Sequence, residues 1–86
     1  MSYTRHAIPP QTPDDWFRHL LGARAALDGG VVRRKTRDME RMVGRARFVK
    51  EIERRGYTVL ENAGQLVIFC NSEPVVLLTG RGGRLS

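Results

Sequence analysis

The apolar residues between positions 37 and 55 change phase at Gly44, and this break limits how the middle of the chain can fold. At about 100° of helical rotation per residue, a first apolar set gathers within about 60° of one line along the helix. It comprises Met39, Met42, Val43 and Ala46. A second set is rotated by roughly 120° from the first. It comprises Phe48, Val49 and Ile52. One straight helix cannot bury both sets against one surface, and glycine lowers helix propensity at the changeover. We therefore expect a kink or break near Gly44–Arg45, with helices at about 36–43 and 46–55.

The residues before this region predict an N-terminal helix over 13–28. Thr12 is a favourable N-cap, Pro13 suits the first helical position, and two aspartates follow at the positive end of the helix dipole. Apolar residues then recur at helical spacing, and Gly29–Gly30 ends the pattern. Trp16 and Phe17 are expected to be core anchors.

After Gly56 the pattern becomes that of strands. Residues 57–61 and 65–70 are rich in β-branched and aromatic types, and Asn62-Ala63-Gly64 between them suits a hairpin loop. A turn at 71–74 precedes an apolar run at 75–79, which we expect to be a third strand with both faces covered. Residues 31–34 suit either a brief strand or a connector.

These patterns predict an α+β fold. It consists of an N-terminal helix, a kinked or broken basic helix pair and a three-stranded antiparallel β-meander. We expect a flexible arm at 1–11, one small domain at 12–79 and a flexible basic tail at 80–86.

The chain has 86 residues and a single cysteine, Cys70. One domain is all that this length allows, and no apolar run approaches the ~18 residues that a membrane span needs. The start of the sequence lacks the apolar core of a signal peptide, and a lone cysteine makes no internal disulfide, so we expect a cytoplasmic protein. Because so small a core gives marginal stability, a partner protein, a second copy or a nucleic acid could supply what is missing.

The net charge of +6 lies entirely in residues 33–55. Ten basic residues there oppose four acidic ones, whereas the segments on either side are each neutral. A local arginine excess is a common electrostatic signature of nucleic-acid contact, since the guanidinium grips phosphate with two donors. A solvated helix face with i,i+4 pairs such as Glu51 to Arg55 is the alternative. The expected contacts to nucleic acid or to an anionic partner are Arg33, Arg34, Arg37, Arg41, Arg45, Arg47, Lys50, Arg54 and Arg55.

The sequence offers little for enzymatic chemistry. His6 and His19 have no partner at metal-ligand spacing, and no nucleophile elbow or phosphate loop occurs. We expect no metal, no cofactor and no catalytic residue, with Cys70 as a small core residue. The one enzymatic alternative is a toxin-like ribonuclease in which Glu61, Tyr57 and nearby arginines surround a scissile phosphate.

Two resemblances rest on element order. A short strand at Val31–Val32, a helix ending in Met42-Val43-Gly44, a second helix at 48–55 and a hairpin at 57–70 resemble a winged-helix domain, and the helix at 13–28 completes the order. The resemblance implies that the second helix of the pair enters the major groove while the hairpin follows the backbone. Arg45, Arg47 and Lys50 would then face the groove, and Arg54 and Arg55 the phosphates. The turn at Gly44–Arg45 is shorter than is usual in that family.

The second resemblance covers residues 48–84. The segment FVKEIERRGYTVLENAGQLVIF, a turn and PVVLLTGRGGR are similar to HicA-like toxins, which are double-stranded-RNA-binding-like domains that cleave messenger RNA. The catalytic histidine of that family follows a glycine on the second strand, whereas Gln65-Leu66-Val67 follows Gly64 here. The resemblance therefore implies a chain without that catalysis.

Together these observations favour a small, basic, non-enzymatic nucleic-acid-binding or regulatory module, with DNA favoured over RNA. If about five of its cations engage phosphates, log K should fall with log salt at a slope of about −4.5. The competing interpretation is a protein-interaction subunit whose arginines meet an acidic partner.

Overall fold

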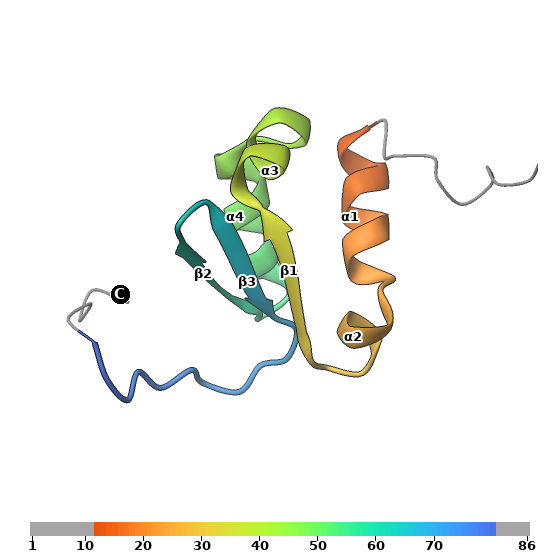
Figure 1. Ribbon diagram of the computed structural model, residues 1–86. Coiled ribbons are helices and arrows are strands. Elements are labelled where there is room, and N and C mark those ends of the chain that lie inside the picture. The colour runs from red at the N-terminus through yellow and green to blue at the C-terminus, as the bar shows by residue number, and fades with distance from the viewer. Residues whose placement is uncertain (1–11, 81–86) are drawn as a thin grey trace, which may run out of the picture.

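The computed structural model describes residues 12–80 (Figure 1). The predicted arm at 1–11 and all of the predicted tail except Gly80 lie outside these residues. The elements, in chain order, are α1 (Pro13–Leu21), α2 (Arg24–Leu27), β1 (Val31–Lys35), α3 (Thr36–Met42), α4 (Arg45–Arg54), β2 (Thr58–Asn62) and β3 (Gln65–Phe69). The α+β class, the N-terminal helix, the helix pair and the three antiparallel strands are as expected.

The break at Gly44 is confirmed. α3 ends at Met42 and α4 begins at Arg45, with Gly44 between them at a φ of 96°. The glycine N–H bonds the Met39 carbonyl at 3.0 Å, and the Phe48 N–H bonds the glycine carbonyl at 3.1 Å. Because glycine adopts this left-handed conformation without a Cβ penalty, the chain can turn here. Met39 of the first apolar set and Phe48 and Ile52 of the second are then buried in one core, whereas Ala46 and Val49 are exposed.

The predicted helix over 13–28 is divided in the structure. α1 is capped by the Thr12 hydroxyl, which accepts from the Asp15 N–H at 3.0 Å, and it ends before Gly22. Ala23 is extended, so α2 starts in a new direction, with Ala26 buried. Leu27, the last apolar residue of the helix predicted over 13–28, is 70% exposed because the turn at 22–23 rotates it away from the core.

The third strand comes from a different part of the chain than predicted. The sheet order is β1-β3-β2, with Val32 opposite Ile68 on one side of β3 and Val59 opposite Ile68 on the other. Residues 75–79 form no strand, so that prediction is wrong. The physical reason is that β3 already has a neighbour on each side, so the segment that follows it finds no free edge of β3 to pair with. Figure 1 shows this segment leaving the end of β3 and running past β2.

The core lies between the inner face of the sheet and the helices. Its fully buried side chains are Leu20, Met39, Phe48, Ile52 and Ile68. Trp16 and Phe17 are buried as predicted and meet Phe48 in a three-ring cluster, with ring centroids 5.6 to 6.4 Å apart. Cys70 is also buried, as expected of a small core residue, and burial raises the pKa of its thiol.

Candidate anion-binding surface

Five of the nine predicted cations are held by carboxylates of the chain itself. The five arginines are Arg41, Arg45, Arg47, Arg54 and Arg55, and the carboxylates belong to Asp14, Asp38, Glu40, Glu51 and Glu61. Five positive charges therefore meet five negative ones, and this group contributes no net charge.

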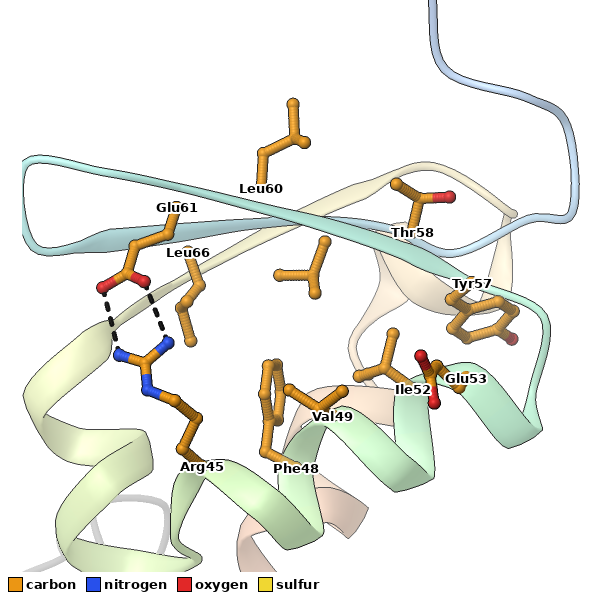
Figure 2. Close-up of a pocket in the computed structure, with 11 residues that line it drawn as sticks. Arg45, Phe48, Val49, Ile52, Glu53, Tyr57, Thr58, Leu60, Glu61 and Leu66 are labelled. Carbon is orange, nitrogen blue, oxygen red and sulfur yellow. Dashed lines mark hydrogen bonds and ion pairs between the residues drawn. The ribbon is translucent and has the colours of Figure 1, made fainter. Parts of the chain in front are cut away.

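Arg45 joins three elements of the fold. From the first turn of α4 its guanidinium donates to Glu40 in α3 at 2.7 Å and to both carboxylate oxygens of Glu61 in β2, at 3.0 and 3.3 Å (Figure 2). The hydrogen bond that Arg45 donates to Glu61, with the one it donates to Glu40, raises the pKa of Arg45. The bond from Arg45 also lowers the pKa of Glu61. With two carboxylates around one guanidinium, this point of the surface is net negative and suits an inter-element link better than a phosphate contact.

The other four arginines are held in similar ways. Arg47 bonds Asp14 of α1 at 2.7 Å, and its guanidinium lies 5.8 Å from the centre of the Phe17 ring. Arg54 and Arg55 share Glu51, at 2.7 and 2.8 Å, and the bond from Arg54 lowers the pKa of that carboxyl. The expected Glu51 to Arg55 pair is thus present. Arg41 bonds Asp38 at 3.3 Å within α3.

The remaining four predicted cations have no carboxylate partner among residues 12–80. Arg34 is half-buried and donates to the Arg33 carbonyl at 2.7 Å, and desolvation lowers its pKa. Arg33 and Arg37 are exposed, the first on β1 and the second in the first turn of α3. Lys50 is exposed on the side of α4 that faces away from the buried Phe48 and Ile52.

Lys35 belongs with these free cations, although the set predicted from sequence left it out. β1 alternates exposed and covered residues, so Arg33 and Lys35 lie on its exposed side while Val32 faces the core. We call Arg33, Lys35 and Arg37 the basic edge, because β1 is an edge strand and α3 follows it directly. The signal that could have found Lys35 is the strand period of two, once 31–35 is assigned as a strand.

The turn of the hairpin lies against the basic edge. The Thr36 N–H donates to the Gly64 carbonyl at 2.9 Å, which fixes the hairpin loop beside the start of α3. In the sheet register Lys35 pairs with Gln65, and Gln65 pairs with Asn62, so the lysine and two exposed amides form one row. Amide and cationic side chains of this kind hydrogen-bond phosphate oxygens, sugars and base edges.

A groove of about 380 Å³ runs between α4 and β2 (Figure 2). The Arg45–Glu61 pair closes one end, apolar side chains such as Val49 and Leu66 line the middle, and Tyr57 lies beside Glu53 at the other end. Tyr57 and Glu61, the pair invoked for a ribonuclease, thus lie apart, and Glu61 is held ionised by Arg45. A general acid at neutral pH needs a raised carboxyl pKa, so this arrangement lends the ribonuclease alternative no support.

Residues 12–80 contain neither a cluster of metal-ligating side chains nor a helix suited to span a membrane. No group of three or more histidine, cysteine, aspartate or glutamate side chains is placed to hold a metal ion. None of the helices described is both long and apolar enough to cross a bilayer. Comparison with known proteins finds no family that matches the sequence, no curated protein with significant similarity and no solved structure that matches significantly.

Proposed function

We propose that this chain is a small, non-enzymatic nucleic-acid-binding module whose basic edge contacts the phosphates of duplex DNA. The observation that carries the proposal is that Arg33, Lys35 and Arg37 are exposed, adjacent and unpaired within residues 12–80, beside the exposed amides of the hairpin turn. Phosphate contacts of this kind fix a protein on the duplex without reading its sequence.

The ion-paired arginines contribute little in this proposal. Exposed ion pairs are individually weak, so a phosphate could in principle displace a carboxylate. Each displacement, however, would leave that carboxylate unpaired beside the polyanion, and its repulsion would offset the new contact. Within residues 33–55, four exposed cations have no carboxylate partner among residues 12–80, namely the basic edge and Lys50, and these avoid this cost.

The choice of DNA rests on the winged-helix resemblance. That resemblance requires a short strand before the helix pair and a hairpin after it, and β1 and the β2–β3 hairpin occupy these positions. In the carried-over arrangement α4 approaches the major groove, and Lys50 is the unpaired cation on its exposed side. Arg45, Arg47, Arg54 and Arg55, which the resemblance also placed on the DNA, are instead held by carboxylates.

The test compares two double variants that lose the same charge. Arg33→Gln with Arg37→Gln removes two free cations, and Arg41→Gln with Arg54→Gln removes two paired ones. Each phosphate contact contributes about 0.9 to the slope of log K against log salt concentration. Because the first variant loses two such contacts, at ~0.1 M salt it should bind a labelled DNA duplex roughly 60-fold more weakly. The second should bind within about threefold of the wild type, because no phosphate contact is lost.

Fluorescence anisotropy on nuclease-treated protein gives both affinities. Equal loss in the two variants would mean that only net charge matters and would refute a local site. Polyglutamate serves as a competitor: the acidic-partner interpretation predicts that it displaces the duplex as well as unlabelled DNA does. An RNA duplex of the same sequence that binds more tightly than the DNA would overturn the choice of polymer.

A further inference from the structure

The segment after β3 presents apolar side chains to solvent. Four apolar residues in succession follow Pro74, and Val76 and Leu78 are 71% and 87% exposed. This apolar segment adjoins the outer face of the sheet, where the side chains of Leu60 and Phe69 are half-buried. We call this surface the apolar patch, and its residues are Leu60, Phe69, Val75, Val76, Leu77 and Leu78. A soluble monomer rarely exposes large apolar side chains in a contiguous group, so the patch calls for a partner surface.

The patch contains both projecting side chains and a hollow that could receive them. A cavity of about 580 Å³ lies between the segment and the outer face of the sheet, and it is lined by residues of the patch together with Asn71, Glu73, Pro74 and Thr79. Val76 and Leu78 are the most exposed side chains of the patch, and both also border this cavity. A two-fold axis through such a surface lets the projections of one copy enter the hollow of the other, which is the self-complementarity that an isologous dimer requires.

The charge distribution also favours a second copy as the partner. Two chains of net charge +6 repel each other over their basic surfaces. Residues 57–80 contain no lysine or arginine, and their two acidic residues are Glu61, which is paired with Arg45, and Glu73. The residues of the patch therefore bring no cation of their own into a contact between two copies. An acidic protein, in contrast, finds its complement at the basic edge and no cation in this segment.

We infer that the apolar patch is the interface of a two-fold symmetric homodimer, in which Val76 and Leu78 of each copy enter the hollow beside Leu60 and Phe69 of the other. The patch itself includes no residue of β1 or α3, and Arg33 lies on the same face of the sheet as Leu60, with Val67 between them in the register. The inference goes beyond the proposed function and does not depend on it, because it concerns the protein without nucleic acid.

The test is sedimentation velocity on the nuclease-treated full chain. At concentrations up to ~100 µM the wild type should sediment at twice the chain mass of 9.8 kDa. Val76→Asn with Leu78→Asn should sediment as a monomer, and because both side chains are exposed its helical circular dichroism should match that of the wild type. Leu27→Asn is the matched control: it replaces a leucine on α2 that is 70% exposed and lies outside the patch, and the variant should stay dimeric.

Three results would overturn the inference. A monomeric wild type over the whole concentration range would exclude the dimer, and would leave the patch for a different protein. A double variant that remains dimeric would place the interface elsewhere. Loss of the dimer in Leu27→Asn as well would show that the association does not depend on this patch.

Discussion

Phe48 is the side chain that joins α1 to α4, and replacing it with leucine tests the packing of the fold. Its side chain is 1% exposed, and its ring meets Trp16 edge-on at 5.8 Å and stacks with Phe17 at 6.4 Å. Leucine keeps much of the apolar volume but loses both ring contacts, each worth about 0.5–1.5 kcal/mol beyond area burial. We therefore expect Phe48→Leu to lower the free energy of unfolding by about 1–3 kcal/mol.

Urea denaturation followed by Trp16 fluorescence measures this loss directly. For a small domain with a slope near ~1 kcal/mol per molar urea, the midpoint should fall by about 1–3 M. Val49→Ala is the control on the same helix, since Val49 is 38% exposed and the change should cost less than about 1 kcal/mol. A wild-type midpoint in Phe48→Leu, or an equal loss in Val49→Ala, would refute the account of how α1 docks.

Three further outcomes follow from individual residues. Gly44→Ala should destabilise by about 1–2 kcal/mol in the same assay, from left-handed backbone strain alone, because an added Cβ meets nothing within 4 Å; an unchanged midpoint would contradict this. Cys70 should react with a thiol reagent only as fast as the fold opens, so prompt reaction of the native protein would show that the thiol is not buried. The pKa of Glu61 is lower in the folded protein than in the unfolded chain. The stabilisation that Glu61 provides is therefore fully present above the unfolded pKa of about 4.3, and it is lost as the pH falls through the folded-state pKa. The urea midpoint should therefore fall on acidification, and by less in Glu61→Gln; an identical pH profile for the two proteins would show that the Arg45–Glu61 pair does not contribute.

The sequence predicted the helix pair because its evidence is local. The phase change of the apolar residues and the glycine at the changeover both lie within about five turns of helix. The same holds for the Glu51–Arg55 pair, whose partners are four residues apart. The hairpin followed from its strand-forming runs and a glycine-containing loop, and both strands are present with Gly64 at a φ of 79°.

The third strand required information that local pattern does not hold. Residues 75–79 are more apolar than 31–35, yet 31–35 pairs with β3 and 75–79 does not. Which of these two segments pairs with β3 depends on where the helices of the fold place each segment. Val32 faces the core opposite Ile68, and backbone bonds from Thr36 to Gly64 and from Cys70 to Gly30 continue the pairing at both ends.

The structure divides the nine cations predicted for the site into ion-paired and unpaired ones, a division that the sequence does not contain. Two of the neutralising carboxylates lie far away in sequence: Asp14 is 33 residues from Arg47, and Glu61 is 16 residues from Arg45. No spacing rule brings them together, so the sequence could not separate paired arginines from free ones. The fold does so: among the exposed cations of residues 33–55, it leaves the basic edge and Lys50 without a carboxylate partner in residues 12–80.

The salt dependence of DNA binding by the wild-type protein tests this partition most directly. The four cations of the proposed site, which are the basic edge and Lys50, predict a slope of log K against log salt concentration of about −3 to −4, at ~0.9 for each phosphate contact. If all nine cations predicted from sequence engaged phosphates, the slope would be about −8. A slope near −8, or a binding constant independent of salt, would contradict the account.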